Sequence, residues 1–112
     1  IDPGNQYHEG YESWQYCAGL LGRYIRAVGV KDVSFTMDLS KADTPGKGWQ
    51  TVIAPFYEGI TNWENLVTAL NKADFSGTFV FMPFYSTDNA SMMTEILKKE
   101  VVYLKKIVSE IA

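Results

Sequence analysis

Charged residues follow two apolar segments of the chain, at the points where these segments should end as strands. Asp2 follows the apolar first residue, and Lys31 and Asp32 follow the apolar segment 24–30. A third apolar segment, 77–84, ends in a proline and an aromatic residue. In a barrel of alternating strands and helices, residues at the carboxyl ends of strands face the active site. We therefore expect Asp2 and Lys31 to lie where a ligand binds or a reaction takes place.

The sequence offers few other groups for catalysis or metal binding. His8 is the single histidine, and a lone histidine is more often a surface residue than a ligand. If metal or proton chemistry takes place here, His8 with Asp2 is the pair that would carry it. Cys17 is the single cysteine, which excludes a disulfide within this chain and a multi-cysteine zinc site. Its aromatic neighbours predict a small buried apolar side chain.

Apolar residues at helical spacing predict three helices. The first covers 9–22, where a glycine ends it. The second begins at Thr61, because Thr61 with Glu64 three residues later forms a capping box. The third begins near 89–91 and continues to the end of the chain.

Two apolar segments, 24–30 and 77–84, predict buried strands. Between the first strand and the second helix, residues 33–60 predict a long irregular connection. Short strands are expected within it around Ser34–Met37 and Thr51–Ile53. Its apolar content argues against disorder, so we expect the connection to pack over another part of the protein.

The order of these elements predicts an α/β fold with parallel strands joined by helical crossovers. A complete (β/α)8 TIM barrel needs roughly 250 residues, and this chain has 112. We therefore expect residues 1–112 to be the C-terminal portion of such a barrel, with its last strands and helices. Two strands leave open edges and exposed apolar faces. The expected partners are the missing N-terminal part of the barrel or further copies of this chain.

Composition narrows the range of partners. The net charge is −3, which argues against nucleic-acid binding because that function needs a basic face. No apolar run approaches the roughly 20 residues of a membrane span, and no signal peptide is visible. A cytoplasmic location is therefore expected, although a missing N-terminus would hide a targeting segment.

Four segments in order resemble the C-terminal portion of the sugar phosphate isomerase/epimerase family, the xylose isomerase-like TIM barrels. IDPGN resembles a strand end of the family, and YIRAVGVKD resembles its strand ending in His-x-Lys-Asp. Residues 54–79 resemble a stretch with a Gly-Glu-Gly motif and a Tyr-x-Gly strand. FVFMPF and EVVYLKKIV resemble the closing Glu-Pro strand and the last helix. The resemblance implies an enzyme that acts on a carbohydrate by proton transfer.

Metal-dependent members of this family hold a divalent cation (Mn, Mg or Zn) with two glutamates, an aspartate and a histidine. The aspartate corresponds to Asp2. The histidine corresponds to Gly29 and the closing glutamate to Met82, and neither residue binds a hard cation. The resemblance therefore implies a degraded metal site, with no metal expected in this chain alone. Because the closing glutamate often serves as an acid or base, the two-carboxylate proton shuttle also lacks one partner.

The resemblance assigns further roles at the barrel mouth. Lys31 would hold a phosphate or a sugar oxygen, or instead form a salt bridge with Asp32 or Glu58. Glu58, in the position of the Gly-Glu-Gly glutamate, would orient a ligand or brace its loop. Asn5 would donate to a ligand hydroxyl or cap its own turn.

Aromatic residues offer a wall on which a sugar would stack, or cover for the end of the barrel. These candidates are Trp49, Phe56, Tyr57 and Tyr85. With Asp2, Lys31 and Glu58 as the expected catalytic residues, the ligand-binding set is Asn5, His8, Trp49 and Tyr57.

Two functions remain open. The first is an isomerase or epimerase whose catalytic carboxylates lie mostly upstream of this chain. The second is a non-catalytic barrel that binds a sugar or polyol and has lost the metal, which the joint occurrence of Gly29 and Met82 favours. The endonuclease branch of the family is disfavoured, because its multi-metal site needs several histidines.

Overall fold

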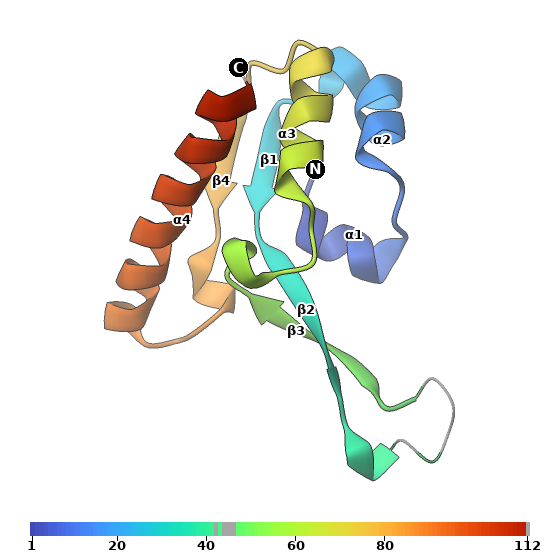
Figure 1. Cartoon of the computed structure of the whole chain (residues 1–112), viewed down its shortest axis with the longest axis vertical. Coiled ribbons are helices and arrows are strands. Elements are labelled where there is room, and N and C mark those ends of the chain that lie inside the picture. The colour runs from blue at the N-terminus through green and yellow to red at the C-terminus, as the bar shows by residue number, and fades with distance from the viewer. Residues whose placement is uncertain (42, 44–46, 112) are drawn as a thin grey trace.

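The computed structural model describes residues 1–41, 43 and 47–111, and within these ranges the chain is a mixed α/β structure (Figure 1). Its helices and strands follow in the order α1 (Pro3–Glu9), α2 (Trp14–Leu21), β1 (Ala27–Val30), β2 (Asp32–Met37), β3 (Trp49–Ala54), α3 (Trp63–Lys72), β4 (Thr78–Phe81) and α4 (Ala90–Ile111). Short 3₁₀ turns lie at Gly22–Tyr24, Leu39–Lys41, Phe56–Glu58 and Pro83–Tyr85. None of the helices in the described ranges is both long and apolar enough to span a bilayer.

The predicted parallel pairing is confirmed. β1 and β4 are hydrogen-bonded neighbours in parallel orientation, with Val28 opposite Phe79 and Val30 opposite Phe81. Because α3 lies between them in the chain, β1 and β4 are joined through a helical connection, as parallel strands require. Both strands are shorter than predicted, and residues 22–24 form a 3₁₀ turn instead of the start of β1.

Ile1 extends this pair by one position. Its amino group donates to the Ala27 carbonyl at 2.9 Å, and the Gly29 amide donates to the Ile1 carbonyl at 2.8 Å. This is the hydrogen-bond pattern of a parallel ladder, so Ile1 occupies a strand position beside β1. The three carboxyl ends, at Asp2, Lys31 and Met82, therefore lie at one edge of the assembly.

The core lies on one face of the β1–β4 pair. Val28 and Val30 are fully buried against the helices, in one cluster with Trp14, Leu66, Leu70 and Leu104. The residues that alternate with them point to the other face. There Ala27, Thr78 and Val80 are exposed, so in the described part of the chain this face carries no covering layer.

The helix predicted over 9–22 is wrong in its extent. The structure contains two helices, because α1 begins at Pro3 with Asp2 as its N-cap, and the chain breaks at Gly10 with a φ of 124°. α2 then restarts after Ser13, whose hydroxyl accepts from the Tyr16 amide. A proline at the first helical position favours this early start.

The second predicted helix is correct but its cap is displaced. α3 is capped by Asn62, whose side chain accepts from the Asn65 amide, and not by Thr61. The Thr61 side chain is bound to Asp32 instead. α4 begins where predicted, with the Asn89 side chain accepting from the Met92 amide.

The connection 33–60 is more regular than predicted. β2 and β3 form an antiparallel hairpin with Asp32 opposite Ala54 and Met37 opposite Trp49, which confirms the two expected strands. Figure 1 shows this hairpin projecting away from the helices and the parallel pair. Its outer half packs on nothing else in the described ranges, so the expectation that the connection covers another part of the protein is wrong there.

Candidate functional site

Lys31 lies at the centre of a polar cluster at the carboxyl end of β1. The residue is only 6 % exposed. Its ammonium donates to Asn5 Oδ1 at 2.7 Å and forms an ion pair with Asp2 Oδ2 at 3.2 Å. A buried lysine is rare unless its charge is paired, and here α1 supplies both partners. The cluster therefore depends on the docking of α1 against the end of β1.

Tyr85 completes the surroundings of this ammonium. The Lys31 Nζ atom lies 4.4 Å from the centre of the Tyr85 ring, a distance at which the ring face attracts a cation. Tyr85 belongs to the 3₁₀ turn after β4 and is 47 % exposed. The Phe84 ring lies on Tyr85 as well, with ring centres 4.2 Å apart, so the ammonium and a second aromatic ring both pack against Tyr85.

The backbone of α1 holds Asp2 and Asn5 in place. Asp2 Oδ1 accepts from the Asn5 amide as the N-cap of α1, which leaves Oδ2 for Lys31. Gly4 permits the close approach, since a Cβ atom there would lie 3.1 Å from the Lys31 carbonyl oxygen. The proline, glycine and aspartate of the opening segment therefore act together to bring a carboxylate to Lys31.

These contacts correct two expectations about Lys31 and Asn5. The salt-bridge partner of Lys31 is Asp2, so the expected partners Asp32 and Glu58 are wrong. The Asn5 side chain binds Lys31 and does not cap its own turn, because Asp2 performs that function. With its oxygen turned to the ammonium, the Asn5 amide group presents its two N–H donors to other partners.

The positions expected to carry metal ligands do lie together. A Cβ atom on Gly29 would lie 3.4 Å from Asp2 Cγ and 2.5 Å from Met82 Cε. The methyl end of Met82 thus fills the space that a side chain on Gly29 would need. Glycine and methionine supply no hard donor, so Asp2 is the one residue of these three positions that does. Its carboxylate is already paired with Lys31. The residues present do not fit a divalent cation.

Among residues 1–41, 43 and 47–111, no three histidine, cysteine or carboxylate side chains gather closely enough to hold a metal ion. His8 is exposed, and its Nδ1 atom lies 3.3 Å from the Thr51 hydroxyl on β3. Its contact is therefore with the hairpin and not with Asp2.

The remaining predicted site residues lie apart from Lys31. Glu58 is exposed on its 3₁₀ turn. Tyr57 packs against Tyr103 of α4, with ring centres 6.3 Å apart. It also lines a hollow of about 590 Å³ on the outer side of α4. Trp49 begins β3 at the outer end of the hairpin, about 16 Å of extended strand from Ala54 beside Asp32.

Asp32 was treated in the sequence only as a possible partner of Lys31, but it is the hub of a buried network. Its carboxylate accepts from the Thr61 hydroxyl at 2.9 Å and from Trp63 Nε1 at 2.8 Å, as well as from the Val33 and Thr61 amides. Burial raises the pKa of Asp32 above its usual value, against the opposing effect of these hydrogen bonds. The network ties the end of β1 to the start of α3.

Glu100 is a second buried carboxylate that the sequence analysis missed. It lies on α4, is 2 % exposed and accepts from the Phe56 amide at 3.3 Å through Oε1. Its Oε2 atom has no protein partner, and burial raises the pKa of Glu100. Glu100 lies four residues after Ile96 and four before Leu104, so helical spacing places it on the core side of α4. This spacing was the signal in the sequence that could have identified Glu100 as buried.

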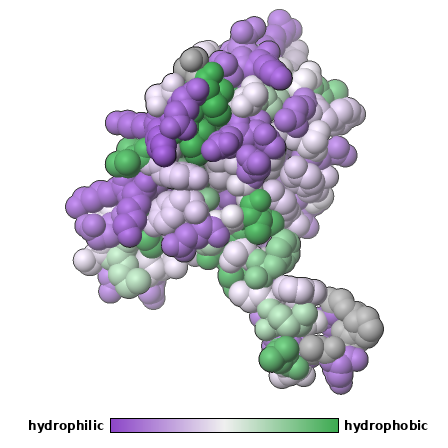
Figure 2. All heavy atoms as spheres, viewed as in Figure 1, coloured by the Kyte–Doolittle hydropathy of each residue, from purple (hydrophilic) through white to green (hydrophobic). Residues whose placement is uncertain are grey.

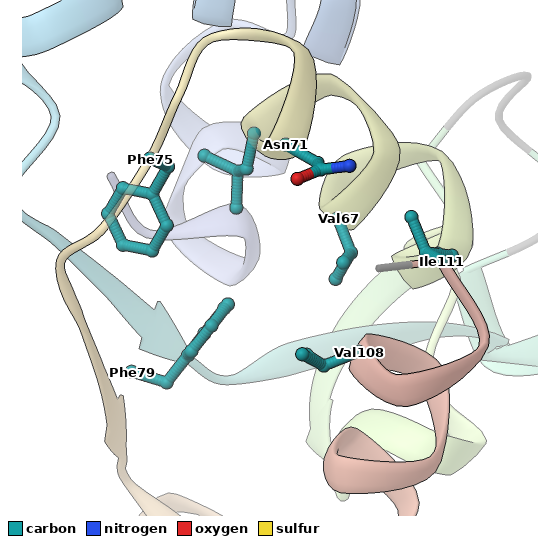
Figure 3. Close-up of a pocket in the computed structure, with 7 residues that line it drawn as sticks. Val67, Asn71, Phe75, Phe79, Val108 and Ile111 are labelled. Atoms are coloured by element: carbon teal, nitrogen blue, oxygen red, sulfur yellow. The ribbon is translucent and has the colours of Figure 1, made fainter.

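A small apolar pocket of about 90 Å³ lies elsewhere, between α3, β4 and the end of α4. Figure 3 shows Phe75, Phe79, Val67 and Val108 around it, with Asn71 as its polar residue. Ligand sites are usually several times larger. The pocket also lies toward the amino end of β4, away from Lys31, and so forms no part of the candidate site.

Comparisons with protein-family models, with curated proteins and with solved structures gave no match for this chain.

Proposed function

We propose that this chain is the C-terminal portion of a xylose isomerase-like barrel that binds a small carbohydrate without a divalent metal. The observation that carries this proposal is the buried Lys31 ammonium at the carboxyl end of β1, held by Asp2 and Asn5 beside the Tyr85 ring. In α/β folds, ligands bind at the carboxyl ends of parallel strands. The polar cluster is located at that end.

The groups of the cluster match the chemistry of a sugar. The Asp2 carboxylate has lone pairs left for ligand hydroxyls, and the Asn5 amide has N–H groups that donate to sugar oxygens. Lys31 contributes a fixed positive charge, which favours a phosphate or an electron-rich oxygen. Tyr85, with Phe84 packed on its ring, adds partly exposed aromatic surface beside the ammonium for contact with the apolar part of a sugar. Glu58 and Tyr57 lie farther off and have no part in this proposal.

The uncovered face of the β1–β4 pair supports the barrel. Parallel strands are normally buried on both faces, and here the face with Ala27, Thr78 and Val80 is open in the described ranges. Further strands of a barrel would enclose that face and turn it into the packed interior. The partner would be the remaining part of the barrel.

A second candidate is an isomerase or epimerase, favoured by the 3.2 Å ion pair between Asp2 and Lys31. In that case the Asp2 carboxylate takes a proton from the carbon next to a sugar carbonyl, and the Lys31 ammonium gives a proton to the carbonyl oxygen. In the second half, Asp2 returns its proton to the former carbonyl carbon. The neutral Lys31 amine takes the proton of the other enediol hydroxyl, whose oxygen becomes the new carbonyl, and both groups regain their starting protonation states. General acid–base groups at hydrogen-bond distance are the requirement for this step.

Native mass spectrometry tests whether the remaining part of a barrel accompanies this chain, and a ligand titration tests the proposed carbohydrate site. The protein is purified from its source with everything that accompanies this chain, and pentoses, hexoses and their phosphates are titrated by calorimetry. We expect binding that Lys31→Met weakens at least tenfold. Lys98→Met, at an exposed lysine on α4, serves as the control and leaves affinity unchanged. Binding that survives Lys31→Met would refute the proposed site, and conversion of a bound sugar would favour the second candidate.

A further inference from the structure

The β2–β3 hairpin carries an uncharged apolar strip on one of its faces. Residues opposite each other in an antiparallel pair share a face, and the register therefore places three pairs on this side. They are Val33 with Ile53, Phe35 with Thr51 and Met37 with Trp49. The other face carries Ser34, Val52, Thr36 and Gln50. We call the first set the arm strip.

The arm strip begins in the core and continues into solvent. At its inner end Val33 is fully buried, and Thr51 lies against His8 of α1. Farther out, Phe35 is 48 % exposed and Trp49 59 %. Figure 2 shows hydrophobic residues along the projecting arm. The apolar surface that α1 covers at the base thus extends beyond the reach of α1.

An isolated two-stranded ribbon is marginally stable in water. In the described ranges no third strand pairs with either outer edge of the arm, and the Ile60 amide donates to the Val33 carbonyl only at the base of β2. Residues 32–37 and 49–54 contain no proline or lysine that would protect such an edge. The outer half of the arm therefore gains stability if another surface covers the strip.

We propose that a second copy of this chain covers the arm strip, so that two arms pack face to face about a twofold axis. A twofold contact joins the same patch on both molecules, and the strip has no charge that would repel its copy. This inference is independent of the carbohydrate site.

The area agrees with a weak dimer. Phe35, Met37, Trp49 and the neighbouring Leu39 are between 39 and 82 % exposed. At about 200 Å² for an aromatic side chain, with Met37 and with Leu39 of the adjoining 3₁₀ turn counted as no larger, they present at most about 450 Å² per chain. Two copies would then bury at most about 900 Å², below the roughly 1,000 Å² of a stable specific interface and in the range of weak, transient contacts. We therefore expect a dimer that dissociates in the micromolar range.

Sedimentation equilibrium of the 112-residue chain tests this proposal, over concentrations that bracket micromolar affinity. Phe35→Glu and Trp49→Glu each place a charge in the strip and should shift the dissociation constant at least tenfold toward monomer. Thr36→Glu places the same charge on the opposite face of β2 and should leave it unchanged. Circular dichroism confirms that each variant is folded.

Acrylamide quenching gives a second readout, because Trp14 and Trp63 are buried and quenching reports mainly on Trp49. Quenching should fall as the dimer forms. A chain that stays monomeric at high micromolar concentration overturns the proposal. So does a dimer that responds equally to Thr36→Glu and Phe35→Glu. A monomer with a protected Trp49 would mean that the arm packs on its own chain in solution, and it would equally overturn the proposal.

Discussion

We expect two substitutions to create metal-binding capacity at the edge where Asp2, Gly29 and Met82 lie together. Gly29→His and Met82→Glu would place an imidazole and a second carboxylate beside Asp2. The backbone of Gly29 is suitably placed, since its Cβ position lies 3.4 Å from Asp2 Cγ. Three protein ligands with open positions suit a divalent ion such as Zn²⁺. We expect the double variant to bind Zn²⁺ or Mn²⁺, and the natural chain and each single variant to bind neither.

A Cβ atom on Gly29 would lie 2.5 Å from Met82 Cε. Because that methyl group is the free end of a flexible side chain, it can move aside, and Gly29→His alone should cost little unfolding free energy. The double variant removes that methyl group. Metal at one hundred times its dissociation constant then adds about 2.7 kcal/mol. For a chain of about 100 residues this raises Tm by roughly 10–20 °C.

Thermal unfolding with and without metal, followed by circular dichroism, measures this shift. Adding Asp2→Asn to the double variant provides the control, because this substitution removes the hard donor of the natural chain. The rise in Tm with metal should then be smaller. A folded double variant whose Tm does not respond to Zn²⁺ or Mn²⁺ would refute the reasoning. In that case the three positions are too far apart, or too tightly held, to converge on one ion.

Two further predictions concern the buried carboxylates. Asp32→Ala leaves four buried donors without this acceptor, namely the Val33 amide, the Thr61 amide and hydroxyl, and Trp63 Nε1. Each costs about 1–3 kcal/mol, and removal of a carboxylate whose pKa is raised by burial returns part of that cost. The unfolding free energy in urea should therefore fall by about 4 kcal/mol, the lower end of the sum. A loss below about 1 kcal/mol, the net value of one ordinary hydrogen bond, would contradict this account. Glu100 has a raised pKa in the folded state, so the folded chain binds more protons and stability falls as pH rises from the unfolded toward the folded pKa. Glu100→Gln should make the unfolding free energy depend less on pH and should stabilise the chain at neutral pH. If the pH profile of the unfolding free energy is unchanged in this variant, Glu100 is not the cause of the fall.

Much of the fold could be predicted from local patterns. The apolar segment 77–84 indicated a parallel strand, and the periodic residues after Asn89 indicated α4, because both signals come from neighbours within a few residues. The pairing of β4 is confirmed, but its residues are exposed or half-buried in the described ranges and not buried as predicted. The break between α1 and α2 was missed because the apolar spacing continues across it. There the tertiary contacts of α1 with the ends of β1 and β2 outweigh the local periodicity.

The candidate site was predictable only in part. The strand ends at Asp2 and Lys31 were identified correctly as positions, and so was the proximity of Gly29 and Met82 that the family resemblance implied. The ion-pair partner of Lys31 was not predicted correctly. Lys31 and Asp2 are far apart in the chain, and nothing in the spacing distinguished Asp2 from Asp32 as the ion-pair partner.

The sequence alone determined the alternation of helices and strands, the apolar strand cores and the charged residues that follow them, because these depend on composition and short-range periodicity. Only the tertiary structure decided which charges meet. The contacts of Lys31 with Asp2, of Asp32 with Trp63 and of Glu100 with Phe56 join distant parts of the chain. Each depends on how a helix packs against a strand end, and that geometry is set by the whole core and not by any local run of residues.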